Sequence, residues 1–294
     1  MDIVDLRVFI AVAEQRGFSQ ASHVLHLTQS AVSKRIAGLE DELGQRLFDR
    51  ISRHVDLTPA GHALLPRARH ILLEIQDSVR QLANLDQQIS GPLSLATSHH
   101  IGLHRLPPVL RQFTADYPTV ELDLHFMDSE QACQAVEQGD IELAIVTLPT
   151  HASPLLETET LWHDRLVVVI SPERLPTTTP FDWQACLQQT PTILPSTGTY
   201  TREIIAPLLA RLGVEDHRGM ATNYLETIKM LVSVGLGWSI LPHTLVDDSL
   251  TVVAVPDMSL HRELGRVQHR QRTASNAAKA FCRVLQGFAD PATA

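Results

Sequence analysis

Polar residues with hydroxyl, imidazole or carboxyl groups follow several segments that the sequence predicts as buried strands. Residues 97–100 (TSHH) follow a strand predicted at 93–97, and residues 195–199 (PSTGT) follow one predicted at 192–194. In an open α/β sheet, small ligands bind at the carboxyl ends of strands, where helix N-termini leave amide groups free to hold an anion. We therefore predict a cleft that holds a carboxylate or an inorganic oxyanion between Ser98 and Thr197 or Thr199. The candidate ligand residues are Ser98, His99, His100, Asp128, Ser129, Thr147, Ser196, Thr197, Thr199 and Asn223.

A metal site is a second interpretation of the histidines. His100 and His104 lie four residues apart and would share one face of a helix, a spacing that suits Zn²⁺. No carboxylate or cysteine lies near them in the sequence, and a chain with 15 histidines produces such spacings by chance. We therefore predict no metal site and no cofactor, and we expect His99 to contact an anionic ligand when it is protonated.

Motifs for catalysis are missing from the sequence. It contains no G-x-S-x-G, no Walker loop, and no G-x-G-x-x-G after the first predicted strand. Cys133, Cys186 and Cys282 are far apart and odd in number, so reduced thiols are expected rather than a disulfide framework. A redox role for one of these thiols stays open, but we predict that the chain is not an enzyme.

The elements that must position the candidate ligand residues are short apolar strands that alternate with helical stretches from residue 93 onward. This alternation is typical of a parallel α/β sheet. Strands are predicted at 93–97, 120–126, 143–146, 165–170, 192–194, 220–222, 238–241, 251–255 and 264–268.

Residues 18–40 show a different pattern. Apolar residues at helical spacing on both sides of a break near residues 26–28 predict two short helices. Thr28 can cap the second helix, with Ser30 as another candidate cap. The first turns of that helix would then present Gln29, Ser33 and Lys34 away from the core. This is a helix-turn-helix, in which the start of the second helix reaches base edges in the major groove of DNA.

A wing is predicted after this pair of helices. Residues 49–56 contain Arg50 and Arg53, which we expect to contact phosphates or the minor groove. The net charge of −9 argues against bulk attraction to DNA, and residues 1–58 carry seven Arg or Lys against eight Asp or Glu. Binding must then depend on where the cations lie and on two copies acting together. The candidate DNA contacts are Thr28, Gln29, Ser30, Ser33, Lys34, Arg35, Arg50 and Arg53.

The same region resembles the N-terminal domain of LysR-type transcriptional regulators. The resemblance is carried by Ala21-Ser22, Leu25, Thr28–Ser33, Lys34-Arg35, Leu39-Glu40, Leu43-Gly44, Leu47-Phe48, Arg50 and Leu57–Gly61. Ser22 stands where the family usually has a second alanine, and it is small enough to keep a close helix contact. Weaker similarity continues at Leu106-Pro107, Phe113, Tyr117-Pro118, Gly139-Asp140, Gly235–Gly237 and Leu241-Pro242.

The expected fold class is α+β, with three parts. Residues 1–58 form a winged helix-turn-helix and residues 59–90 form a long linker helix. Residues 91–294 form an effector-binding domain, which the resemblance implies has two lobes like a periplasmic binding protein. Lobe I would comprise about 92–160 and 266–294, and lobe II about 163–265.

The linker helix carries a heptad seam. Its apolar positions recur at steps of three and four, which predicts a coiled contact with a second copy or with the chain's own first helix. We favour a homodimer, because one winged domain reads only half of a palindromic site, and we expect a tetramer from the resemblance. The seam residues are Leu65, Ala68, Leu72, Ile75, Val79 and Leu82.

These observations predict a regulator that binds promoter DNA and answers to a small effector, either a carboxylate or an oxyanion, held between the lobes. The alternative is an architectural DNA-binding protein whose C-terminal domain only oligomerises. No stretch approaches the roughly 20 apolar residues of a membrane span, and the N-terminus carries acidic Asp2 and Asp5. We therefore expect a cytoplasmic protein without a membrane partner.

Overall fold

The computed structural model describes residues 1–49, 55–86, 88–175, 183–214 and 219–291. The chain divides into two compact units, Met1–Asp86 and Gln87–Ala294. Within the described ranges, no helix combines the length and the apolar character needed to cross a membrane.

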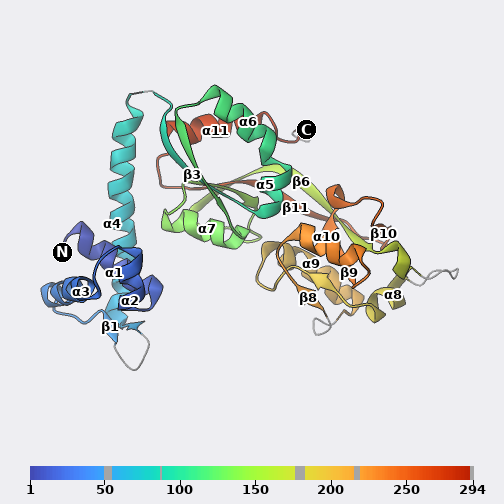
Figure 1. Ribbon diagram of the computed structural model, residues 1–294, viewed down its shortest axis with the longest axis horizontal. Coiled ribbons are helices and arrows are strands. Elements are labelled where there is room, and N and C mark those ends of the chain that lie inside the picture. The colour runs from blue at the N-terminus through green and yellow to red at the C-terminus, as the bar shows by residue number, and fades with distance from the viewer. Residues whose placement is uncertain (50–54, 87, 176–182, 215–218, 292–294) are drawn as a thin grey trace. The chain divides into compact units, whose positions relative to one another are not determined.

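The first unit is a winged helix-turn-helix followed by a long helix (Figure 1). Its helices begin where the sequence supplies caps: Asp2 and Asp5 form a capping box at α1, while the hydroxyls of Thr28 and Thr58 cap α3 and α4. Gly44 ends α3 in the left-handed conformation. The elements are α1 (Ile3–Gln15), α2 (Phe18–Val24), α3 (Gln29–Leu43), β1 (Phe48–Asp49), β2 (Asp56–Leu57) and α4 (Pro59–Asn84).

The core of this unit lies between α1, α3 and the first half of α4. Phe9 and Ile36 are fully buried, and each contributes roughly 1.5–3 kcal/mol through burial. Three of the predicted seam positions, Leu65, Ala68 and Leu72, pack against this core. The first half of the heptad seam therefore packs against the core of its own domain. The far end of the seam is open, since Val79 is 64% exposed and Leu82 is 68% exposed.

The second unit is built on a seven-stranded sheet with the order β10-β6-β11-β5-β3-β4, in which β9 also pairs with β6. Within this sheet, the prediction of parallel pairing holds for β3, β4 and β5. The strands β6, β9, β10 and β11 pair antiparallel, so the sheet is mixed. The strands are β3 (Gly91–Thr97), β4 (Val120–Phe126), β5 (Leu143–Thr147), β6 (Leu156–Ile170), β9 (Trp238–Pro242), β10 (Thr251–Val253) and β11 (Leu260–His269).

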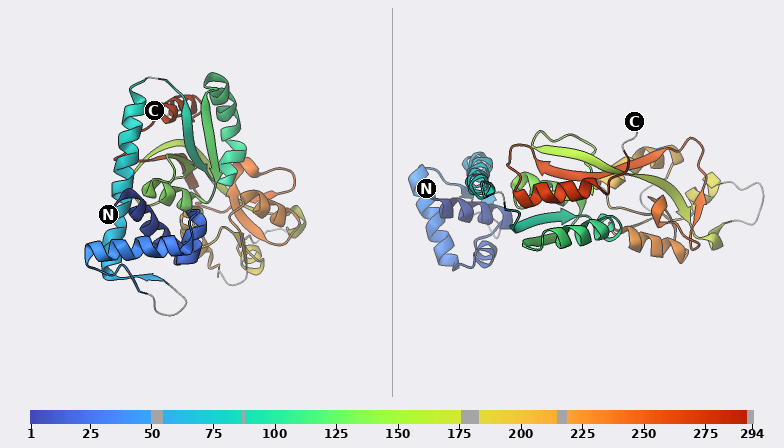
Figure 2. Two further views of the ribbon diagram at one scale, coloured as in Figure 1. Left: turned by 60° about the vertical axis from the view of Figure 1, so that its left-hand side comes forward. Right: turned by 90° about the horizontal axis from the view of Figure 1, so that it is seen from above.

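Helices cover this unit in two groups, which we call lobe I and lobe II. In lobe I, α6 and α11 pack on one face of the sheet and α7 packs on the other (Figures 1 and 2). In lobe II, α9 and α10 pack on opposite sides of the strands around β9, and β7 pairs with β8 in a small parallel sheet. The remaining elements are α5 (His99–His104), α6 (Leu106–Asp116), α7 (Ser129–Gln138), α8 (Trp183–Gln189), β7 (Ile193–Leu194), α9 (Tyr200–Leu212), β8 (Met220–Ala221), α10 (Leu225–Ser233) and α11 (Asn276–Gln286).

Two long strands join the lobes. One half of β11 pairs with β5 and the start of β6, and the other half pairs with the part of β6 that enters lobe II. The register shifts between Leu264 and Gly265, where a Cβ atom on Gly265 would lie 2.0 Å from the carbonyl oxygen of Glu159. Only glycine allows the two backbones to approach this closely.

Candidate functional site

The exposed face of α3 carries most of the candidate DNA contacts. Thr28 accepts a hydrogen bond from the Ala31 amide at 3.2 Å, which fixes the start of the helix. Gln29 and Lys34 are exposed, and Ser33 is half-buried. The Ser30 hydroxyl lies 3.1 Å from that of Thr28 at the same end of the helix. Arg50 and Arg53 lie outside the described residues.

Arg35 differs from the other candidates on α3. Its guanidinium donates to the Asp5 carboxylate at 2.8 Å and lies 3.6 Å from Asp2. These contacts tie α3 to the start of α1. The geometry therefore gives Arg35 an intramolecular role that the sequence prediction did not include.

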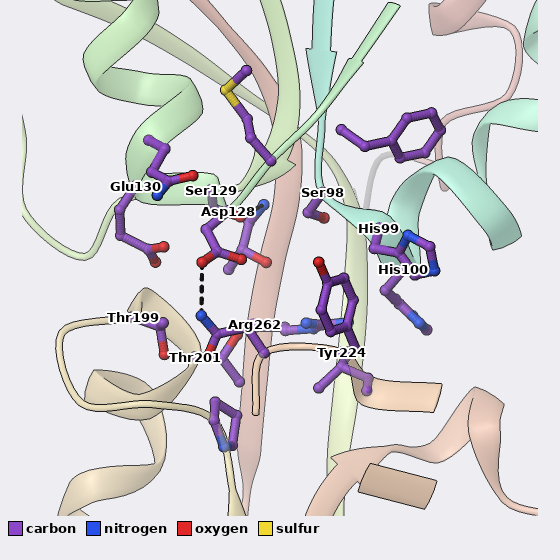
Figure 3. A pocket seen from close by; sticks show the side chains of 17 residues that line it. Ser98, His99, His100, Asp128, Ser129, Glu130, Thr199, Thr201, Tyr224 and Arg262 are labelled. Atoms are coloured by element: carbon purple, nitrogen blue, oxygen red, sulfur yellow. Dashed lines mark hydrogen bonds between the residues drawn. The ribbon is translucent and has the colours of Figure 1, made fainter. Parts of the chain in front are cut away.

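A pocket of about 380 Å³ lies between the two lobes of the second unit (Figure 3). It collects the starts of α5 and α7 from lobe I and the starts of α9 and α10 from lobe II. Of the predicted ligand residues, Ser196 and Thr197 do not line this pocket, and their contact with a ligand stays a prediction. Those that line it are Ser98, His99, His100, Asp128, Ser129, Thr147, Thr199 and Asn223.

Hydroxyls and uncapped helix starts gather on the lobe I side of the pocket. Neither Ser98 at α5 nor Asp128 at α7 makes a side-chain cap, so the first amides of α7 lack the usual side-chain acceptor. The Ser129 oxygen accepts a hydrogen bond from the Thr147 amide at 3.2 Å. A hydroxyl that accepts still has its own proton to donate.

Two carboxylates on the same helix reach across to lobe II. Asp128 accepts from the Asn223 amide nitrogen at 2.7 Å, and the Asn223 oxygen accepts from the Ser196 amide at 2.9 Å. Glu130 accepts from the Tyr200 amide at the start of α9. Burial raises the pKa of Glu130 above its ordinary value, because its charged form loses hydration.

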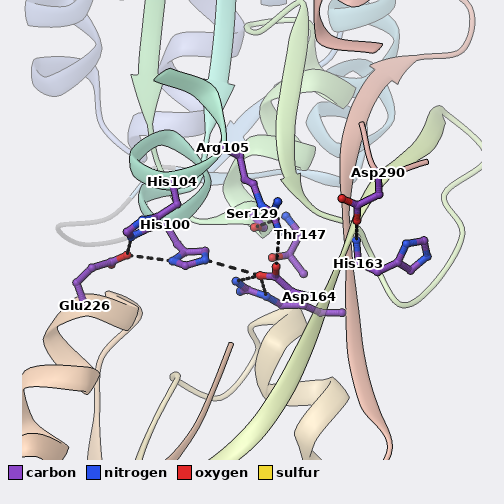
Figure 4. A network of polar contacts seen from close by, with 10 residues as sticks. His100, His104, Arg105, Ser129, Thr147, His163, Asp164, Glu226 and Asp290 are labelled. Carbon is purple, nitrogen blue, oxygen red and sulfur yellow. Dashed lines mark hydrogen bonds and ion pairs between the residues drawn. The ribbon is translucent and has the colours of Figure 1, made fainter. Parts of the chain in front are cut away.

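A buried polar cluster lies beside the pocket (Figure 4). The Asp164 carboxylate accepts from Arg262 at 2.8 Å and from Arg105 at 3.0 Å. His100 lies between two carboxylates, with Nδ1 3.0 Å from Glu226 and Nε2 3.7 Å from Asp164. Burial alone would raise the pKa of both acids. Hydrogen bonds and neighbouring charges outweigh it, so the pKa of Asp164 is well below its usual range and that of Glu226 falls to about 2.

Protein-family models match both units. Residues 3–62 match the model described as "Bacterial regulatory helix-turn-helix protein, lysR family", and residues 86–290 match "LysR substrate binding domain". The chain belongs to the LysR family of transcriptional regulators. This LysR-type regulator thus pairs a DNA-binding helix-turn-helix with a C-terminal effector-binding domain.

Curated relatives agree with this assignment. A segment of 108 residues, 37% of this chain and 75% of the relative, is 63% identical to the "Uncharacterized HTH-type transcriptional regulator in ibpB-leuC intergenic region" of Azotobacter vinelandii. Over 98% of this chain and 96% of the relative, the identity to the "Uncharacterized HTH-type transcriptional regulator YeiE" of Escherichia coli (strain K12) is 32%.

Solved structures share the fold at lower identity. A full-length OxyR variant from Pseudomonas aeruginosa has a TM-score of 0.64 at 22% identity and covers 98% of this chain and 94% of that one. Full-length CbnR complexed with its target DNA has a TM-score of 0.61 at 22% identity and covers 98% of this chain and all of that one.

Several pocket residues of this LysR-type regulator were missed by the sequence reasoning. Tyr224 follows the predicted Asn223, and in Figure 3 its hydroxyl points toward Ser98. Glu130 and Thr201 each lie two residues after a predicted residue, on the same helix start. The full set of missed residues is Phe126, Met127, Glu130, Gln131, Pro195, Thr201, Tyr224, Leu225 and Arg262.

Two of the three thiols are poorly placed for reaction with solutes. Cys133 is 3% exposed, and burial raises its pKa to about 11. Burial also raises the pKa of Cys282, and the nearby Arg266 guanidinium offsets this only in part. Because the thiolate is the reactive form, both side chains should be slow to oxidise at neutral pH.

Proposed function

We propose that this regulator changes its binding to promoter DNA when a small organic acid, one that also carries a hydroxyl or amino group, enters the pocket between the lobes. The observation that supports this most is the composition of the pocket wall. Hydroxyl donors and two carboxylates line the same pocket, and the carboxylates contact Tyr200 and Asn223 of lobe II.

The acid group would bind where the donors are. Ser98, Ser129 and Thr147 stand beside the uncapped start of α7, and amides at a helix N-terminus favour a negative charge. Arg262 lines the same pocket, but its guanidinium already donates to the buried Asp164 carboxylate at 2.8 Å. Hydrogen bonds rather than a free cation would therefore hold the anion.

The second group of the effector would bind the carboxylates. Asp128 and Glu130 are acceptors when ionised and would repel an acid placed against them. A hydroxyl or amino group of the effector can donate to them. A plain oxyanion such as sulfate offers no such donor, so it should bind more weakly than a hydroxy acid or an amino acid.

The ligand would act by stabilising one arrangement of the lobes. Its contacts come from α5 and α7 on one side and from α9 and α10 on the other, so it binds best when both are in place. A ligand shifts an equilibrium only by its difference in affinity for the two states. In a dimer that reads two half-sites, that shift would change the fit to DNA. The candidate contacts to DNA are Thr28, Gln29, Ser30, Ser33, Lys34 and the wing arginines.

Calorimetry on the untagged full chain tests the effector class. We expect hydroxy acids or amino acids to bind more tightly than simple carboxylates and sulfate. Ser98→Ala should weaken binding roughly 10- to 100-fold, since a hydrogen bond to a charged group contributes about 1.5–3 kcal/mol. Thr197→Ala is the matched control, because it removes an exposed hydroxyl on the same stretch of chain as Thr199 without touching the pocket.

The variant Glu130→Gln distinguishes an effector that carries an amino group from one that carries a hydroxyl group. It removes a negative charge and keeps an acceptor, so an amino acid should lose affinity while a hydroxy acid should keep or gain it. Fluorescence anisotropy on promoter DNA, with and without the bound acid, then measures the response. If no acid binds, or a bound acid leaves DNA affinity unchanged, the C-terminal domain serves oligomerisation and the architectural alternative is correct.

A further inference from the structure

We propose that His100, His104 and Glu226 form a binding site for a divalent transition metal ion, such as Zn²⁺, that links the two lobes beside the effector pocket. Sequence reasoning rejected a metal here because no carboxylate lay nearby. The fold supplies one from α10, 122 residues away from His104.

The three side chains converge as metal ligands do. His100 Nδ1 lies 3.0 Å from Glu226 Oε1, and His104 Nε2 lies 2.9 Å from the same oxygen. One ligand atom from each of the three residues lies within 4.8 Å of the other two. An ion with Zn–N and Zn–O bonds of about 2.0–2.2 Å fits between atoms at such separations.

The position of His100 suits a metal ligand that also has an outer partner. Both of its ring nitrogens face carboxylates, Glu226 at 3.0 Å and Asp164 at 3.7 Å. A neutral imidazole has one N–H and one lone pair, so it can bind a metal ion through one nitrogen and donate through the other. A metal on Nδ1 uses that lone pair and leaves the Nε2 proton for Asp164. A carboxylate behind a metal-bound histidine is the usual outer support of such sites.

Glu226 gives a second, independent indication. Its Oε1 faces both histidines, while its Oε2 is buried and has no hydrogen-bond partner among the described residues. A buried carboxylate oxygen without a partner is costly. A metal ion beside the carboxylate would compensate for it by charge.

The ligand types select the class of ion. Two imidazoles and one carboxylate suit Zn²⁺, Ni²⁺ or Co²⁺, whereas Mg²⁺ and Ca²⁺ prefer oxygen ligands alone. His100 is 4% exposed and Glu226 is half-buried, so the ion would be partly shielded from water. Because α5 belongs to lobe I and α10 to lobe II, the ion would hold the lobes together whichever effector the pocket takes.

Titration calorimetry on the untagged full chain, with ZnCl₂ as the probe, tests the site. We expect one saturable equivalent per chain. His104→Ala and Glu226→Gln should each weaken it by more than about 100-fold, because even an outer partner contributes roughly 10- to 100-fold. His104 is 43% exposed at its side chain, so its replacement should not disturb folding. A titration with MgCl₂ should show no saturable binding.

His243→Ala is the matched control, since His243 is exposed on lobe II and is not part of the cluster. It should bind Zn²⁺ as the wild type does. Co²⁺ should give the visible absorption of a tetrahedral site in the wild type and in His243→Ala only. If the wild type shows no saturable equivalent, or if His104→Ala and Glu226→Gln retain it, the proposal is wrong and the cluster is an ion pair alone.

Discussion

Replacing Asp164 by Asn should strongly destabilise the second unit, because it leaves a buried cation without its counter-charge. The side chain of Asp164 is 0% exposed and that of Arg262 is 3% exposed, and they meet at 2.8 Å. Removing one partner of such a pair costs about 3–5 kcal/mol. At roughly 2–4 °C per kcal/mol for a unit of this size, the melting temperature should fall by roughly 6–20 °C.

The pH dependence gives this prediction a second readout. The ordinary pKa of this carboxyl is 3.8, and in the folded protein it is held far lower, because nearby His100, the charge of Arg262, and hydrogen bonds from Arg262 and Arg105 outweigh the effect of burial. Its contribution is therefore complete above pH 3.8 and is lost only as the pH falls further. Wild type and Asp164→Asn should differ most near neutral pH and converge in acid.

Calorimetric melts of the full chain measure the effect, with Asp247→Asn as the control. Asp247 pairs with Lys229 at 2.6 Å on the surface, so its loss should matter far less. The double variant Asp164→Leu with Arg262→Met removes both charges and should be more stable than either single variant. A shift below about 2 °C for Asp164→Asn would refute the reasoning, because it would mean that Arg262 finds water or another partner at little cost.

Three further predictions concern other parts of the chain. Leu82→Glu should weaken self-association in sedimentation velocity without lowering the melting temperature, whereas Leu72→Ala should lower the melting temperature; the reverse would contradict our assignment of the seam. Gln29→Ala should relax discrimination between operator bases by about 1–3 kcal/mol, while Lys34→Ala should weaken binding to all sequences and reduce the salt slope by about 1 in anisotropy titrations. If both variants changed sequence discrimination and salt dependence in the same way, the assignment of Gln29 to bases and Lys34 to phosphates would be wrong. Alkylation of Cys133 in the native protein should stay slow until the pH approaches 11; rapid modification at pH 7 would show that the helix opens.

Local sequence patterns were sufficient for the helix-turn-helix. Thr28 caps α3 as predicted. A helix cap can be read from the sequence because the hydroxyl bonds to an amide only three residues further along the chain. The same holds for β3 and β4, whose apolar stretches have few alternatives to a strand. Each of the nine predicted strands overlaps a strand in the described part of the second unit.

The missed features depend on distant partners. The first half of β6 was overlooked because it is polar, and its side chains find partners across the sheet: Glu159 pairs with Arg266, and Glu157 accepts a hydrogen bond from Gln268 at 3.0 Å. The strand at β6 was predicted to be parallel to its neighbours, but it pairs antiparallel with them. The apolar content of a strand does not determine its direction. Glu226 lies 126 residues from His100, so no local pattern could have joined them.

The bulge at Gly265 lies where the two strands that join the lobes cross from one lobe to the other. The lobes are linked by paired strands and not by loose tethers, so relative motion must bend a hydrogen-bonded ribbon at a position where a methyl group would collide with Glu159 at 2.0 Å. If the proposed effector moves the lobes, we expect the stiffness of that bend to set how much ligand is needed for half of the response. Substitutions near this point could therefore move the dose threshold of the regulator while the chemistry that selects its signal stays the same.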